Sequence, residues 1–164
     1  MKTLRRGHRT HPVRRRRAEE GFSLVEIVLT LAFSGRSLID NRRLAGAARA
    51  VGTEVRWVEQ RARTERRCWR IQFAPGAESY EVQYLAGGVW TAGGGCGGGT
   101  WTDYTGAART LPPRIDMVRT TFGGDVMTVS PYGNPNAGTL LLQTPGGEQR
   151  RVTINVGGRV TITR

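Results

Sequence analysis

The chain has 164 residues but only two cysteines, two histidines and one lysine. Cys68 and Cys96 are too few for a disulfide framework and lack the spacing of a metal site. Both histidines, His8 and His11, lie in the basic first segment, so the remainder has none for acid–base catalysis or a serine–histidine pair. Gly93–Gly99 lacks the Lys-Ser/Thr ending of a phosphate-binding loop. We therefore expect no enzyme activity, no cofactor and no metal.

The sequence also lacks a long hydrophobic run. The longest, Phe22–Phe33, has 12 residues and is interrupted only by Glu26. As a helix it would extend about 18 Å, whereas a bilayer core of about 30 Å needs roughly 20 apolar residues. We therefore expect residues 22–39 to form a short membrane-anchor helix. Such a helix would insert if the Arg36 side chain extends to the membrane interface and the bilayer thins locally.

Positive charge, by contrast, is abundant. The formal net charge is +12, and residues 1–21 alone carry eight bases and two acids, so half of the charge precedes Phe22. A strongly basic chain raises nucleic-acid binding as a hypothesis. A basic tract directly before an apolar run is instead typical of a segment held on the cytoplasmic side of a membrane. We favour the second interpretation for residues 1–21.

A glycine separates the basic tract from the apolar run. An ordinary secretory signal has its apolar region before the cleavage site and loses it, but cleavage after Gly21 would remove the charges and keep the apolar segment. The sequence Gly-Phe-Ser-Leu-Val-Glu at 21–26 resembles the prepilin cleavage and methylation motif. The resemblance implies that residues 1–21 are a basic leader peptide. It also implies that prepilin peptidase cuts between Gly21 and Phe22 and methylates the new amine of Phe22.

By the same resemblance Glu26 becomes the fifth residue of the mature chain. A carboxylate inside a membrane segment is costly and marks a function with a nearby partner. In a filament that partner is the positively charged N-terminal amine of an adjacent subunit, which gives Glu26 a role in assembly. The alternative is a buried helix of a soluble protein that starts at Phe22, with Glu26 favoured in its first turn by the helix dipole.

Beyond residue 40 the apolar pattern predicts a helix and then a sheet. Apolar positions spaced by three and four residues predict an amphipathic helix over 40–67; they are Leu44, Ala48, Val51, Val55, Val58 and Ala62. From Cys68 the period drops to two, and turn signals divide the β-rich segment 68–164 into strands around a glycine-rich loop at 86–100. The predicted strands are Cys68–Phe73, Tyr80–Leu85, Ile115–Thr120, Val126–Ser130, Thr139–Gln143, Arg151–Asn155 and Arg159–Thr163. The fold class is therefore α+β, a long N-terminal helix followed by a small antiparallel β-sheet domain.

The C-terminal part resembles the globular domain of the GspH/FimT-type pseudopilins. The similarity lies in Val129–Gly133, Gly138–Leu142 and Val152–Val160, where a strand, a Gly-Arg turn and a final strand close the domain. It implies a pilin-like fold and a minor pseudopilin in the periplasmic filament of a type II secretion system or type IV pilus. The implied partners are prepilin peptidase, other pseudopilins or minor pilins, and the inner membrane, crossed once with the globular domain in the periplasm.

Two alternatives remain open in the sequence. Some FimT-like minor pilins are linked to DNA uptake, and basic side chains beside exposed aromatics can track phosphates and stack bases. The candidate DNA contacts are Arg66, Arg67, Arg70, Arg159 and Arg164, with Trp57 and Trp69 nearby. The other interpretation is a solvated basic helix face with both tryptophans in the core. Cys68 and Cys96 form either one disulfide, if this part lies outside the cytoplasm, or two unpaired thiols.

Overall fold

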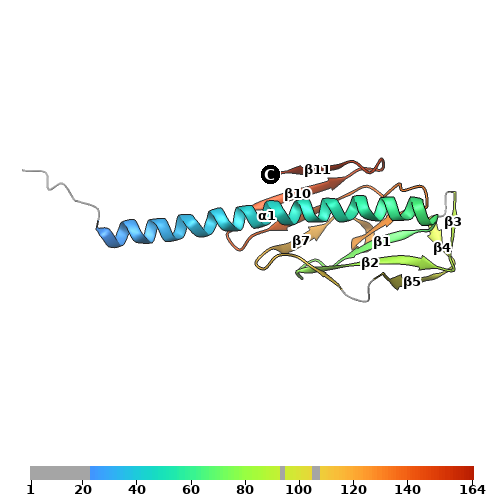
Figure 1. Ribbon diagram of the computed structural model, residues 1–164, viewed down its shortest axis with the longest axis horizontal. Coiled ribbons are helices and arrows are strands. Elements are labelled where there is room, and N and C mark those ends of the chain that lie inside the picture. The colour runs from blue at the N-terminus through green and yellow to red at the C-terminus, as the bar shows by residue number, and fades with distance from the viewer. Residues whose placement is uncertain (1–22, 93–94, 105–107) are drawn as a thin grey trace, which may run out of the picture.

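The structure, a computed structural model, describes residues 23–92, 95–104 and 108–164. One helix, α1 (Leu24–Glu65), is 42 residues long, which corresponds to about 63 Å. Its first part projects as a rod beyond a compact body, and its second part lies along that body (Figure 1). The predicted leader 1–21 and the predicted cleavage site at Gly21 and Phe22 lie outside the described residues.

Local sequence explains where α1 begins and ends. Ser23 caps the N-terminus, with extended backbone and a side chain that accepts a hydrogen bond from the Val25 N–H. Arg66 ends the helix in the left-handed conformation, with φ 54°, as residues after a helix C-terminus commonly do. Every member of the predicted apolar stripe from Leu44 to Ala62 is fully buried, so this half of the helix is stabilised by its packing against the sheets.

The strands form two main antiparallel sheets and a small third one (Figure 1). The first sheet has the order β5-β2-β1-β8, with β6 also paired to β2. It consists of β1 (Trp69–Phe73), β2 (Ser79–Ala86), β5 (Thr100–Asp103), β6 (Arg109–Thr110) and β8 (Val126–Val129). The second has the order β11-β10-β9-β7 and consists of β7 (Asp116–Thr120), β9 (Gly138–Gln143), β10 (Gln149–Ile154) and β11 (Val160–Thr163). The third pairs β3 (Val89–Thr91) with β4 (Gly95–Gly97), and a 3-10 turn, η1 (Gly123–Asp125), precedes β8.

The core lies between α1 and the sheets. The helix packs against β1 and β8 of the first sheet and against β9, β10 and β11 of the second. Alternate residues of the strands point inward, as the burial pattern of β1 shows for Trp69, Ile71 and Phe73. The α+β class predicted from the sequence is confirmed.

One local prediction was wrong. Residues 86–100, expected to be a glycine-rich loop, contain β3, β4 and the start of β5. Gly95–Gly97 pairs with Val89–Thr91 through backbone groups, so this strand needs no side-chain alternation and leaves no periodic signal in the sequence. Gly88 and Gly99 also lie where a Cβ would meet backbone atoms within 3.0 Å, which explains why glycine is concentrated here.

Candidate assembly surface

The projecting half of α1 begins with a capping box. The Ser23 backbone N–H donates to Glu26 Oε2 at 3.2 Å, and Ser23 Oγ accepts from the Val25 N–H at 3.3 Å. Two backbone donors that a helix start leaves without partners are satisfied in this way. The structure thus places Glu26 in the exposed first turn of the helix, where its negative charge interacts favourably with the positive end of the helix dipole.

Exposed apolar side chains mark this half of the helix. Leu24, Val25, Val28, Leu29, Leu38 and Ile39 are each more than half exposed. Exposed apolar side chains that gather on one element are typical of a surface that contacts a protein or a membrane. Within the described ranges no helix contains a stretch long and apolar enough to cross a bilayer.

A polar collar holds α1 at the point where it leaves the body. Asp40 Oδ2 accepts from the Arg114 guanidinium at 3.0 Å, and its side chain is only 12% exposed. The next residue of the helix makes a second contact with the body: Asn41 Nδ2 donates a hydrogen bond to Glu148 Oε1 at 2.8 Å. Arg114 and Glu148 come from the loops flanking the second sheet. The collar therefore fixes the direction in which the projecting half extends from the body.

The opposite end of the molecule is closed by a disulfide. Cys68, at the start of β1, is bonded to Cys96 of β4, with Cα atoms 5.9 Å apart. The bond ties the β3–β4 hairpin to the end of α1, at the right in Figure 1. An open pocket of about 430 Å³ lies beside the hairpin and is lined by Arg66, Gly88, Val89, Trp90, Pro131 and Tyr132.

The five arginines proposed for DNA contact do not form one surface. Arg67 binds Glu65 at 3.1 Å and lies over the Tyr84 ring, and Arg70 donates to Gln83 at 2.6 Å. Burial lowers the pKa of the Arg70 guanidinium, and the carboxylates of Asp103 and Glu81 oppose that shift. Three of the five thus cluster at the end of α1, namely Arg66, Arg67 and Arg70. Arg159 lies in the β10–β11 turn, and Arg164 lines a separate pocket with Asn41 and Glu148.

The nearby tryptophans belong to the interior. Trp69 is fully buried, and Trp57 packs edge-on against it with ring centroids 5.6 Å apart. Tyr104 contacts both rings at 5.1 Å. Trp69 therefore offers no open face on which a base could stack. Trp57 is half-buried, and the Arg61 guanidinium lies over its ring, 5.2 Å from the centroid.

One buried carboxylate was not noticed in the sequence. Glu59 on α1 is 8% exposed, and its Oε1 has no hydrogen-bond partner among the described residues. Burial raises the pKa of its carboxyl group, while the charges of Arg63 and Arg56 act in the opposite direction. It faces Gly158 in the β10–β11 turn, where a Cβ would lie 2.7 Å from Glu59 Oε2. Glu59 lies outside the apolar stripe of the helix, so the sequence pattern does not predict that the β10–β11 turn covers it.

The described residues contain no group of three or more histidines, cysteines or carboxylates that could hold a metal ion. The features that stand out in the described residues are an apolar projecting helix, a polar collar and a disulfide-closed tip. Such surfaces suit contacts with other macromolecules.

The arrangement of one long helix on small antiparallel sheets is similar to that of solved minor pseudopilin and type IV minor pilin structures. The structure is similar to EpsH, the minor pseudopilin of the type 2 secretion system of Vibrio cholerae, with a TM-score of 0.54 and 17% identity. The match covers 74% of this chain and 96% of that chain. It is also similar to the type IV minor pilin FimU of Pseudomonas aeruginosa, with a TM-score of 0.52 and 15% identity over 77% and 92% of the two chains. No protein-family model and no curated protein sequence matches this chain.

Proposed function

We propose that this protein is a minor subunit of a type II secretion or type IV pilus filament, anchored in the inner membrane with its body in the periplasm. The observation that carries the proposal is the projecting half of α1. Six of its apolar side chains, Leu24, Val25, Val28, Leu29, Leu38 and Ile39, are each more than half exposed. Burying such surface stabilises an assembly by about 25 cal/mol per Å², so packing against the corresponding helices of neighbouring subunits is the favoured outcome.

The N-terminal motif supports the same function. Processing after Gly21 would leave the apolar helix at the very start of the mature chain, with a methylated amine on Phe22. Glu26 would then exchange its capping contact with Ser23 for the amine of an adjacent subunit, which sets the axial register of the filament. Charge-assisted hydrogen bonds of this kind are roughly twice as strong as neutral ones.

Intact mass spectrometry tests the proposal. The full chain is produced in cells with and without prepilin peptidase, recovered from membranes and weighed. We expect a mature chain that begins at N-methylated Phe22 and depends on the peptidase. The variant Gly21→Val should remain unprocessed, whereas Gly7→Val, a glycine of the same leader, should be processed normally. An unprocessed wild-type chain in cells with active peptidase would disprove the assignment.

A further inference from the structure

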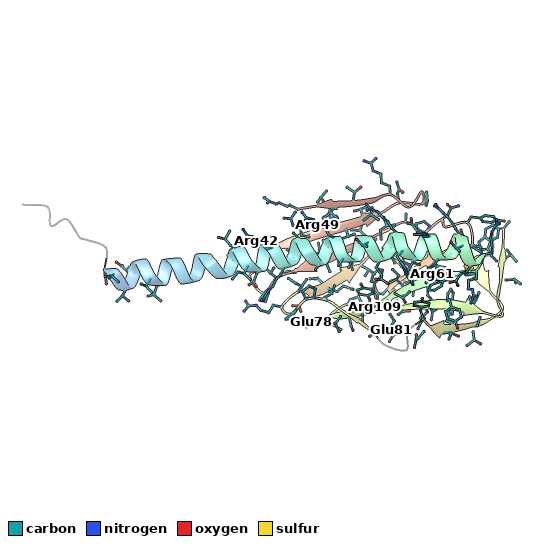
Figure 2. All side chains as sticks on the ribbon, viewed as in Figure 1. Arg42, Arg49, Arg61, Glu78, Glu81 and Arg109 are labelled. Atoms are coloured by element: carbon teal, nitrogen blue, oxygen red, sulfur yellow. A yellow bond between two sulfur atoms is a disulfide. The ribbon has the colours of Figure 1, made fainter. Side chains whose placement is uncertain are left out.

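The outer face of α1 carries a row of arginines. Arg42, Arg49 and Arg56 are spaced by seven residues, close to two helical turns, so they lie about 10.5 Å apart along one face. All three are exposed, and Figure 2 shows Arg42 and Arg49 on the same side of the helix. We call this row the arginine stripe.

The stripe lies opposite the buried face of the helix. Each of its arginines precedes a fully buried core residue by two positions: Leu44 follows Arg42, Val51 follows Arg49, and Val58 follows Arg56. Two residues correspond to about 200° around a helix. The arginine stripe therefore lies on the exposed side of the helix, where Arg49 and Arg56 border the edge strand β11 of the second sheet.

The carboxylates of this half of α1 do not neutralise the stripe. Asp40 pairs with Arg114 and Arg43, Glu54 with Arg109, and Glu65 with Arg61 and Arg67. Glu59 is buried against the β10–β11 turn. Among the described residues no ion pair involves Arg42, Arg49 or Arg56. The carboxylates of this half of α1 are thus paired or buried, whereas Arg42, Arg49 and Arg56 are exposed without an ion pair among the described residues.

A groove with both polar and aliphatic lining runs beside the stripe. It lies between α1 and β11, has a volume of about 280 Å³, and is lined by Arg49, Gly52, Thr53, Arg56, Val160 and Ile162. Gly52 allows the strand to approach closely, because a Cβ there would lie 3.3 Å from Val160 Cγ1. Aliphatic side chains between arginines suit a protein partner, which can fill the groove with an apolar side chain and pair its carboxylates with the guanidiniums.

We propose that the arginine stripe and this groove bind an acidic helix of a different filament subunit, one that carries carboxylates at matching seven-residue spacing. The inference rests on the proposed function and names the partner. Leu38, which is 65% exposed, lies one turn before Arg42 on the same face, so an exposed apolar side chain of the projecting half adjoins the stripe. A helix packed along the rod would therefore continue over the arginines.

Two other occupants fit less well. A second copy of this chain would bring its own arginines against the stripe, and like charges facing each other across an interface are destabilising. Duplex DNA presents phosphates to a basic surface and would leave the aliphatic side chains of Val160 and Ile162 in the groove without an apolar partner. An acidic helix satisfies both the spacing and the groove.

The test uses the full chain and a synthetic helical peptide of about 21 residues, with one glutamate every seven residues on one face and leucines beside them. Its control has the same composition with the glutamates distributed around the helix. We expect the first peptide to bind at least about tenfold more tightly than the second, with affinity that falls as salt rises. Equal affinity for the two peptides, or binding to neither, would overturn the inference.

Charge reversal sharpens the test. The variant Arg42→Glu/Arg49→Glu should lose the acidic peptide and bind the same peptide with lysines in place of glutamates. Arg56 is left unchanged because its charge acts on Glu59. The matched control is Arg119→Glu/Arg151→Glu, which reverses two exposed arginines on the outer face of the second sheet. It changes the net charge equally and should keep the wild-type preference.

Three results would count against the stripe. Equal loss in both double variants would mean that only net charge matters. Tighter binding of a DNA duplex than of the acidic peptide, abolished by Arg42→Glu/Arg49→Glu, would assign the stripe to nucleic acid. A dimer that the same variant disrupts would assign it to a second copy. Processing at Gly21 is scored separately in each variant, so failure of this inference is distinguishable from failure of the proposed function.

Discussion

The two halves of α1 differ in what their apolar side chains contact. In the half that lies on the body, Leu44, Val51 and Val58 are fully buried against the sheets. In the projecting half, Leu24 and Leu38 are 78% and 65% exposed. The boundary falls at Asp40, which the Arg114 guanidinium holds against the body. One continuous helix therefore contains a segment that packs on its own body and a segment with exposed apolar side chains.

The difference shows that apolar residues on a helix predict burial only where the element that buries them is also known. The body-packed half repeats apolar residues at helical spacing and keeps polar ones on the outside, so its partner is within the chain. The projecting half carries exposed apolar side chains on more than one side, as Leu24, Val25 and Leu29 show. Its stabilising contacts must come from other molecules if it is to be buried at all.

The largest effect is expected from placing the same charge in each half. Val58→Asp buries an unpaired carboxylate at a fully buried position, which costs several kcal/mol out of a total stability of about 5–15 kcal/mol. The body should lose its cooperative fold. Leu38→Asp, at an exposed position, should change the free energy of unfolding by less than about 0.5 kcal/mol yet reduce incorporation into filaments. Urea unfolding and the amount of chain in sheared filaments measure the two effects. Equal loss of stability in both variants would contradict the comparison.

The next effect concerns the tip. The disulfide between Cys68 and Cys96 closes a loop with a sequence separation of 28. The variant Cys68→Ser/Cys96→Ser should lower the free energy of unfolding by about 2–4 kcal/mol. Hydrogen exchange should speed up first in Val89–Gly97, while amides of the projecting helix keep their rates. Identical unfolding curves for the wild type with and without reductant would show that this bond does not form in solution.

Glu59 gives the body-packed half a pH dependence. Because burial raises the pKa of its carboxyl group, with Arg63 and Arg56 opposing, the folded state binds its proton more tightly than the unfolded state. This contribution to stability is complete below the ordinary carboxyl pKa and is lost as pH rises through the raised pKa. Glu59→Gln should flatten that slope and increase stability at neutral pH, by less than the disulfide contributes. Asp116→Asn, at an exposed carboxylate, should leave the slope unchanged; the same flattening in both variants would exclude Glu59 as the cause.

The smallest effects lie at the boundary itself. Arg43 approaches Asp40 only to 4.0 Å on the helix surface, so Arg43→Ala should cost about 0.2–0.5 kcal/mol. Arg114→Ala removes the 3.0 Å contact to the nearly buried Asp40 carboxylate and should cost about 1 kcal/mol. Thermal unfolding of the two variants measures both values. A larger loss for Arg43→Ala than for Arg114→Ala would mean that the collar does not hold the helix to the body.

Much of this organisation could be predicted from the sequence. The spacing from Leu44 to Ala62 identified the buried face of α1, and alternation identified β1, β2 and the C-terminal strands. These signals are strong because each side of the element meets one kind of environment. The glycine-rich strand β4 could not be found in this way, since glycines pair through their backbones and carry no side chains to alternate.

The surfaces were harder to predict than the elements. Arg49, Arg56 and Arg61 all lie outside the apolar stripe of the helix, but Arg61 binds Glu65 and the Tyr104 hydroxyl whereas the other two are exposed. Which flank a turn or strand covers depends on the tertiary fold. The burial of Glu59 under the β10–β11 turn has the same origin.

The central claim, that the projecting half of α1 packs against other subunits, is tested most directly by placing a photo-crosslinking residue at Leu38. Filaments are sheared from cells, purified and irradiated, and the adducts are mapped by mass spectrometry. We predict adducts to the N-terminal helix of another filament subunit. Incorporation of the chain into filaments with adducts only within the same chain would contradict the account, because Leu38 would then have no intermolecular partner.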